Sequence, residues 1–344
     1  PDLLLLDGLP ATWYIEKGIL ADLSDVLAAA EKENQLNETV VRTYEADGEV
    51  CAIPMKLKIP VLLLERELLQ QEELQRIEEL GLEALAALAQ AHPEQPLIGT
   101  QSGQRLMECF FPVCAPAWIT QDGLQEEGLS KYLYSLKQIL DASTVTYAGA
   151  EMAGDLRDTD DLFHWAFGRS LCTVYEPQSM SSLMSLFAAV RQRGEAELIL
   201  LPGQAQGVYR PVSVMGINAK SEHRELAEAF ICMALAQEAQ SESFHDGFPV
   251  NEEALKSQAA DFDENIYFSM GGYSYDENES LGGGDVTPEE KQRFATLLGQ
   301  VQTPYLADEQ LAQLISEQAE GYFSGEKSLK QAVKDIEEAT KLYL

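Results

Sequence analysis

Two prolines within seven residues constrain the fold of this chain more than any other feature. A short turn and strand at 47–54 end at Pro54, and an apolar run begins at Ile59-Pro60. Because proline has no backbone N–H, neither residue is expected in the middle of a central strand. The apolar run leads directly into a charged segment of helical composition. The chain is therefore expected to cross here from one structural unit to another rather than to extend one hairpin.

The length and charge of the chain limit its class. It has 344 residues, which is longer than one typical domain, and 45% of them are hydrophobic. The 24 basic and 57 acidic residues give a net charge of −33. A field of this sign repels polyanions, so nucleic acid and anionic lipid surfaces are not expected partners. Solubility is the simplest reason for the charge, and attraction of a cationic ligand is the alternative.

Strand and helix patterns alternate along the chain, which predicts an α/β protein. Expected strands are Leu3–Leu6, Leu171–Tyr175, Glu197–Leu201 and Val212–Ile217. Expected helices are Trp13–Ala30, 128–140, 221–240, one from Thr287, 308–323 and 328–343. Ser221 is expected to cap its helix, which would bury Leu226, Phe230 and Leu235 on one face. Thr287 to Glu290 has the pattern of a capping box.

Motifs for catalysis, metals or cofactors are not found. The five cysteines form no CxxC pair, which argues against a disulfide framework and a structural zinc site. The four histidines are scattered singly, and the glycine-rich segments lack the spacing of phosphate-binding loops. With 57 acidic residues, pairs of carboxylates arise by chance and do not predict a glycosidase. We expect no catalytic residue, no metal and no cofactor.

The crossing at 47–69 resembles the first interlobe crossover of the extracellular solute-binding proteins of ABC transporters. The resemblance is to the sugar-binding family 1, the maltose-binding-protein-like type. Three further segments resemble the same family in the same order. They are Pro1–Pro10 running on to Gly18–Leu23, Gly216–Ser221 with the helix after it, and Tyr322–Leu329 with its following helix.

This resemblance implies a two-lobed, type II periplasmic-binding-protein-like fold with hinge crossovers and a helical C-terminus. Lobe one would comprise 1–60 plus 206–245, and lobe two 61–205 plus 246–300. The helices of 301–344 would pack across the outside of both lobes. Family members carry a strand-helix-strand unit before the position that matches Pro1. The chain is therefore expected to be a fragment of a longer protein that lacks its N-terminal segment.

Aromatic residues in predicted loops are the candidates for a ligand site, because sugar C–H faces stack on aromatic rings while polar groups bind the hydroxyls. Core packing remains an alternative for Trp118 and Tyr175, and helix packing for Trp13; Trp165 is expected in the core. In the family, the loop after the strand ending at Tyr175 commonly faces the interlobe cleft. The candidate set is Trp13, Trp118, Tyr175, Gln178, Tyr209, Arg210 and Phe248.

The resemblance implies a receptor that traps a small solute by hinge closure and transforms nothing. The aromatic residues favour a carbohydrate or oligosaccharide as that solute. The implied partner is the membrane permease of an ABC importer. The implied protein is an extracellular monomer, anchored as a lipoprotein at full length. Two alternatives remain: a sensor or adhesion module of a larger surface protein, and a glycan-processing enzyme with a carboxylate pair in the cleft.

Overall fold

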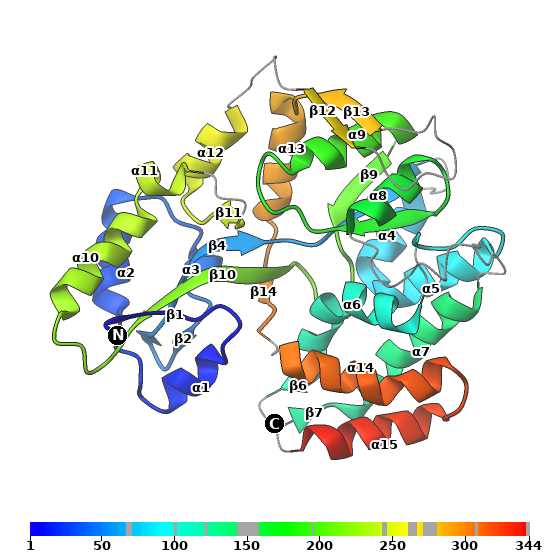
Figure 1. The fold of residues 1–344 in the computed structure, drawn as a ribbon, viewed down its shortest axis with the longest axis horizontal. Helices are drawn as coiled ribbons and strands as arrows, with labels where there is room; N and C mark the ends of the chain where they lie inside the picture. Colours follow the sequence, from blue (N-terminus) through cyan, green and yellow to red (C-terminus); the bar gives the residue numbers. More distant parts are fainter. Residues whose placement is uncertain are drawn as a thin grey trace.

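A computed structural model describes residues 1–66, 71–99, 102–120, 123–142, 158–194, 196–242, 246–260, 267–270, 281–306 and 309–341. Two separate sheets organise it, each with helices packed around it (Figure 1). The first sheet and its helices form the left half of the view, and the second sheet and its helices form the right half. We call these halves the first and second lobes.

The first sheet has the strand order β1-β10-β4-β11, and all three of its pairings are antiparallel. Its strands are β1 (Leu3–Leu5), β10 (Val208–Ile217), β4 (Ile53–Lys58) and β11 (Phe248–Pro249). A short strand, β14 (Thr303–Pro304), pairs in parallel with the start of β10. The predicted strand end at Pro54 is wrong, because β4 continues to Lys58. At Pro54, strand β4 is paired on one side only, by β10, because β11 pairs with Lys56 and Leu57 alone. Proline is tolerated at such an edge position.

The second sheet is smaller and antiparallel, with β5 (Val61–Glu65) between β8 (Cys172–Tyr175) and β9 (Ala196–Leu200). Its central strand is buried from Val61 to Leu64, as expected for a strand covered on both faces. Three two-stranded pairs complete the strands. They are β2 (Glu45–Ala46) with β3 (Glu49–Val50), β6 (Ile119–Thr120) with β7 (Gly123–Leu124), and β12 (Tyr267–Met270) with β13 (Leu281–Gly284).

Helices cover both sheets. In the first lobe they are α1 (Ala11–Glu16), α2 (Ser24–Glu33), α3 (Glu38–Val41), α10 (Arg224–Leu235), α11 (Gln237–Gln240) and α12 (Glu252–Ala260). In the second lobe they are α4 (Gln71–Leu80), α5 (Leu82–Ala91), α6 (Gly103–Cys114), the short 3-10 turn η2 (Ala115–Ala117), α7 (Glu126–Ala142), α8 (Asp158–Ala166), α9 (Leu183–Arg193), α13 (Pro288–Leu298), α14 (Glu309–Phe323) and α15 (Leu329–Thr340).

The described residues show how the chain passes between the lobes. Ile59 and Pro60 connect β4 to β5, and residues 201–207 connect β9 to β10. The third passage leads from α12 of the first lobe to α13 of the second. Beyond α13, β14 pairs with β10 before the chain enters α14. The expected crossing at Pro60 is therefore confirmed, and it lies beside the crossing of 201–207, because the Leu201 N–H donates to the Pro60 carbonyl at 2.9 Å.

The structure shows how two segments at the predicted domain limits pack. Residues 246–260 were expected in the second lobe. In the structure β11 pairs with β4 in the first sheet, and α12 packs against β11 and α11 of the first lobe as well as against α13 of the second. The C-terminal helices were expected across both lobes. Instead α14 packs against α6, and α15 against α7, within the second lobe. Their apolar faces, with Ile315 and Ile336, are buried in the core of that lobe.

The apolar core continues through the crossing. One cluster of buried side chains includes Ile53 of β4, Ile59 between the lobes, and Phe187 of α9 in the second lobe. A second cluster lies on the opposite face of the second sheet, under α5, α6, α7, α14 and α15. A small third cluster packs α1 and Leu20 against the first sheet. The two lobes are thus joined by packed side chains as well as by backbone.

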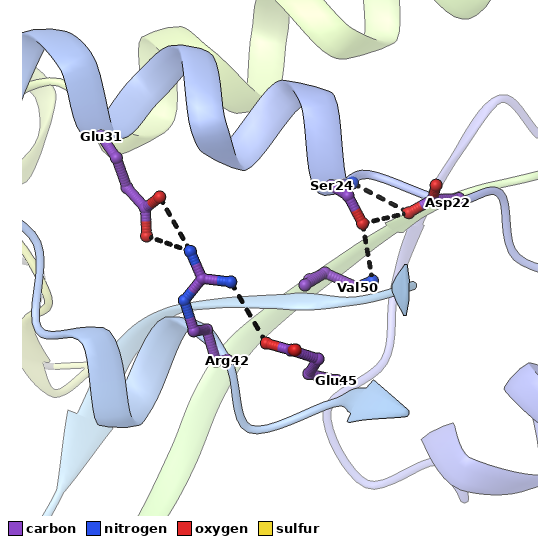
Figure 2. Close-up of polar contacts among 6 residues, drawn as sticks. All are labelled: Asp22, Ser24, Glu31, Arg42, Glu45 and Val50. Carbon is purple, nitrogen blue, oxygen red and sulfur yellow. Dashed lines mark hydrogen bonds and ion pairs between the residues drawn. The ribbon is translucent and has the colours of Figure 1, made fainter. Parts of the chain in front are cut away.

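Polar side chains fix the local geometry of the first lobe (Figure 2). Ser24 begins α2; its backbone N–H and its hydroxyl donate to the Asp22 carboxylate at 2.9 and 2.5 Å. The same hydroxyl accepts from the backbone N–H of Val50 at 3.1 Å, which ties α2 to β3. The hydrogen bonds from Ser24 hold the pKa of Asp22 below its usual value. Arg42 lies between the carboxylates of Glu31 and Glu45.

Several predicted helices differ in detail. Residues 13–30 form two helices, because Gly18 has a φ of +62° and ends the first. Ser221 does not cap α10, whose N-cap is His223; the Ser221 hydroxyl instead accepts from the His223 N–H. Leu226 is 73% exposed, and the buried face of α10 contains Ala227, Ile231 and Leu235. By contrast, the capping box from Thr287 to Glu290 is confirmed.

Helix α7 confirms the predicted apolar stripe of 128–140, and α14 and α15 confirm the predicted C-terminal helices. Residue 308 and residues 342–343 of those predictions lie outside the described part of the chain.

Candidate functional site

A pocket of about 120 Å³ lies where the chain crosses between the lobes. Arg210 of β10, in the first sheet, lines the pocket, and so does Pro60 of the crossing. The second lobe supplies the rest of the lining, Arg105, Glu108, Cys109, Pro112, Val174 and Glu176. Two guanidinium groups, two carboxylates and three apolar residues therefore surround one cavity. Such a lining offers both donors and acceptors to a polar solute.

Arg210 occupies the start of β10, opposite Lys58 of β4. Its guanidinium lies over the ring of Tyr305, 5.5 Å from the ring centre, within the range of a cation–π contact. Its Nε is 3.7 Å from a carboxylate oxygen of Glu176, which is an ion pair without a hydrogen bond. This Nε is buried and finds no hydrogen-bond acceptor among the described residues. A buried donor of this kind is stabilised when an oxygen pairs with it.

Arg105 enters the pocket from the first turn of α6, whose N-cap is Ser102. The Ser102 hydroxyl accepts from the Arg105 backbone N–H at 3.1 Å. The Asp161 carboxylate, almost fully buried, accepts from the Arg105 Nε at 3.2 Å and from a terminal nitrogen at 2.9 Å. Glu108 lies one helical turn away, 3.7 Å from the same guanidinium. Asp161 therefore holds the Arg105 guanidinium through two hydrogen bonds. The Glu108 side chain remains half exposed at the pocket.

The loop after β8 holds Glu176 in place. The Ser182 hydroxyl accepts from the backbone N–H groups of Gln178 and Ser179, at 2.9 and 3.0 Å. The carbonyl oxygen of Gln178 accepts a 2.8 Å hydrogen bond from the N–H of Gly247, which precedes β11 of the first lobe. This loop is thus fixed within its own lobe and tied to the other lobe by one backbone hydrogen bond.

The structure brings three of the predicted residues to this region. Arg210 lines the pocket, while Tyr175 at the end of β8 and Gln178 in the following loop lie on either side of Glu176 in the sequence. Tyr175 is buried, and its hydroxyl donates to the Ser182 carbonyl at 3.4 Å, so it supports the loop and does not line the pocket. Trp13 lies apart on α1 of the first lobe, 47% exposed and edge-to-face with Tyr14. Its exposed ring is available to a solute, although it does not line the pocket.

The three remaining candidates, Trp118, Phe248 and Tyr209, are buried in the structure. Trp118 is fully buried against Phe111 and Tyr132 in the second lobe. Phe248 is fully buried, 4.8 Å between ring centres from Phe294 of α13.

Tyr209 is also buried; its hydroxyl lies 2.8 Å from the Thr43 hydroxyl and 3.0 Å from the carbonyl of Thr39. These three rings were expected in exposed loops, but they are buried among other side chains. Trp165 is buried in the core, as predicted.

Sequence reasoning missed the four polar residues of the second lobe that line the pocket, namely Arg105, Glu108, Cys109 and Glu176. Three of them lie on α6, and the apolar pattern of this helix predicts its buried face but not which of its polar side chains line a pocket. Glu176 follows Tyr175 directly, and a single carboxylate in a chain with 57 acidic residues gives no signal of a site. Lys56 of β4, close to the crossing at Pro60, is buried and paired with Asp246.

Within the described residues, no group of three or more His, Cys, Asp or Glu side chains is arranged to hold a metal ion. All five cysteines lie in the described part of the chain, and none of them forms a disulfide there. Burial raises the pKa of Cys114 to about 12, so this thiol is protonated at neutral pH. In the same part of the chain, none of the helices is both long and apolar enough to span a membrane.

Solved structures identify the architecture. An extracellular solute-binding protein of family 1 from Alicyclobacillus acidocaldarius matches with a TM-score of 0.60 and 16% identity, over 99% of this chain and 84% of that one. A solute-binding protein of Streptococcus pneumoniae in complex with the blood group A-trisaccharide matches with a TM-score of 0.58 and 15% identity, over 99% and 84%. The protein has the two-lobed fold of the type II solute-binding proteins.

A third such structure, the substrate-binding protein Lmo0181 of Listeria monocytogenes in complex with cycloalternan, matches with a TM-score of 0.57 and 16% identity, over 100% of this chain and 85% of that one. No protein-family model matches the chain, and no curated protein matches it in sequence. At this level of identity the likeness concerns the fold, and the predicted fold class is confirmed. In this solute-binding fold, the pocket at Arg210 and Glu176 lies where the two lobes are joined.

Proposed function

We propose that the protein binds a carbohydrate at the crossover pocket and releases it unchanged. The observation that carries the proposal is that Arg210 of the first lobe and Glu176 of the second line the same cavity. A solute that bridges these two side chains is bound best when the lobes are close together. Binding would thereby shift the lobes toward a closed arrangement.

The chemistry of the lining suits a polyhydroxylated ligand. The guanidinium groups of Arg105 and Arg210 donate hydrogen bonds, and the carboxylates of Glu108 and Glu176 accept them. Pro60, Pro112 and Val174 provide apolar contacts for sugar C–H groups. The volume of about 120 Å³ is below the roughly 300–1,000 Å³ of pockets that enclose a drug-sized ligand. We infer that it holds a single sugar unit, either a free one or one end of an oligosaccharide.

Solved structures with this fold support a sugar as ligand and transport as the context. They include complexes with cycloalternan, maltose, the blood group A-trisaccharide and α-D-tagatose. By this analogy we propose that the chain acts as an extracellular receptor that delivers its ligand to the membrane permease of an ABC importer. A monomer held to the cell surface by a lipid anchor in the full-length protein is part of the same proposal.

Isothermal titration calorimetry tests the proposal with maltose, cycloalternan, chitin oligosaccharides, the blood group A-trisaccharide and tagatose as probes. We expect heat of binding from at least one sugar, recovery of that sugar unchanged, and a smaller radius of gyration in X-ray scattering when it is bound. If folded protein gives no heat with any of these sugars, the carbohydrate proposal is wrong. If a sugar is cleaved, the non-catalytic proposal is wrong.

A further inference from the structure

A larger pocket, about 390 Å³, lies on the outer side of the second lobe. It is lined by Gln90 at the end of α5 and by five residues of α7, Tyr134, Lys137, Gln138, Asp141 and Ala142. Helices α5 and α7 pack against each other on the side of this lobe away from the first sheet (Figure 1). Its volume is within the roughly 300–1,000 Å³ typical of ligand pockets. No part of the crossover pocket contributes to it.

Tyr134 gives this pocket an exposed aromatic surface. Its side chain is 52% exposed, although the helix that carries it has a complete apolar face elsewhere. That face buries Leu133, Leu136 and Ile139 against the core of the lobe. The Tyr134 hydroxyl accepts a 3.2 Å hydrogen bond from the amide of Gln138, one turn along α7. The helix therefore packs without the Tyr134 ring, and this hydrogen bond orients the ring at the surface.

Polar groups of both signs surround the ring. Lys137 donates to Asp141 at 2.6 Å, also one turn along the helix. These two charges compensate each other, so this rim of the pocket has no net charge despite the strongly acidic protein. The amides of Gln90 and Gln138 complete the set of donors and acceptors. An aromatic face edged by amides and a balanced ion pair is suited to an uncharged, polyhydroxylated ring.

We propose that this pocket is a second carbohydrate-binding site, in which a sugar ring stacks on Tyr134 and its hydroxyls bind Gln90, Gln138 and the Lys137–Asp141 pair. The site is formed within one lobe, so it binds in any arrangement of the two lobes. It therefore differs from the crossover pocket, which needs residues from both. A chain with both sites would hold a long glycan on its outer surface as well as at the crossing.

The experiment measures binding of maltoheptaose, cellohexaose, xylohexaose and chitohexaose by saturation-transfer-difference NMR and calorimetry. An Arg210→Ala/Glu176→Gln protein isolates the outer pocket, and a Tyr134→Ala protein isolates the crossover pocket. In the first background we expect at least one glycan to bind, and further substitution of Tyr134 by alanine to weaken it about threefold to tenfold. Tyr134→Phe is the matched control: it keeps the ring and should retain binding.

The proposal is overturned if no glycan binds the Arg210→Ala/Glu176→Gln protein while circular dichroism shows it to be folded. It is equally overturned if Tyr134→Ala binds as well as Tyr134→Phe in that background. The Tyr134→Ala protein reports on the crossover pocket separately. Failure of one site is therefore not confused with failure of the other.

Discussion

The Nε of Arg210 lies 3.7 Å from the carboxylate of Glu176, which brings a strand of the first lobe against a loop of the second at one pocket. The two residues are 34 positions apart in the chain and on opposite sides of the second crossing. The distance leaves both groups able to bind a bridging hydroxyl. The same pair therefore lies both at the connection between the lobes and in the proposed binding site.

Replacing Arg210 by alanine should weaken sugar binding at the crossover pocket at least about tenfold, because a hydrogen bond to a charged group contributes about 1.5–3 kcal/mol. The free energy of unfolding should change by about 1 kcal/mol or less, since the ion pair is partly exposed. Calorimetry and urea unfolding measure the two effects. Arg42→Ala is the matched control, because Arg42 also pairs with carboxylates but lies outside the pocket. Equal affinity of both variants would exclude Arg210 from the site.

Replacing Trp118 by alanine should lower the free energy of unfolding by about 3–5 kcal/mol, the usual cost of removing a large buried aromatic side chain. Sugar affinity of the folded fraction should be unchanged. Trp13→Ala removes the same side chain from an exposed position and should change stability by about 0.5 kcal/mol or less. Chemical denaturation compares the two variants. A smaller loss for Trp118 than for Trp13 would contradict the burial described above.

Replacing Gly247 by alanine should destabilise the contact between the lobes. Gly247 has a φ of +128°, and an added Cβ would lie 2.9 Å from Val212 and 3.0 Å from the Leu57 carbonyl. Backbone strain alone costs about 1–3 kcal/mol. Gly194→Ala is the control, because Gly194 also has a positive φ but no atom lies within 4 Å of the position of an added Cβ.

We expect a lower melting temperature for Gly247→Ala than for Gly194→Ala, measured by differential scanning calorimetry. Faster amide hydrogen exchange at residue 247 should accompany it, because its N–H bonds to Gln178. Unchanged exchange at that amide would show that the contact tolerates a side chain.

Stability should depend on the charge of Asp22 at acidic pH. Hydrogen bonds from Ser24 hold the folded-state pKa of Asp22 below its ordinary value of 3.8. The ionised form therefore stabilises the folded protein above about pH 4, and this contribution is lost as the pH falls through the lowered pKa. Asp22→Asn should be less stable than the unsubstituted protein at pH 7, with the difference shrinking toward pH 3. Urea unfolding at pH 7, 5 and 3 checks this; a constant difference would refute the assignment.

The local elements were largely determined by the sequence itself. The periodic apolar residues of 128–140 predicted α7, and Thr287 to Glu290 predicted the start of α13, because such signals act within one or two turns of a helix. Pro54 and Pro60 predicted the crossing, because a residue without a backbone N–H cannot donate a hydrogen bond in the middle of a central strand. The order of four resembling segments predicted the two-lobed fold.

Only the tertiary structure decided which apolar side chains face inward. Helix α10 carries two apolar stripes, and its contact with α2 buries Ile231 while leaving Leu226 exposed. Trp118, Tyr209 and Phe248 resemble ligand contacts in sequence, but long-range packing encloses all three rings. The pocket unites Arg105, Glu176 and Arg210 from distant segments. Burial and pocket lining depend on contacts between residues far apart in the chain, whereas periodicity reports only neighbours along it.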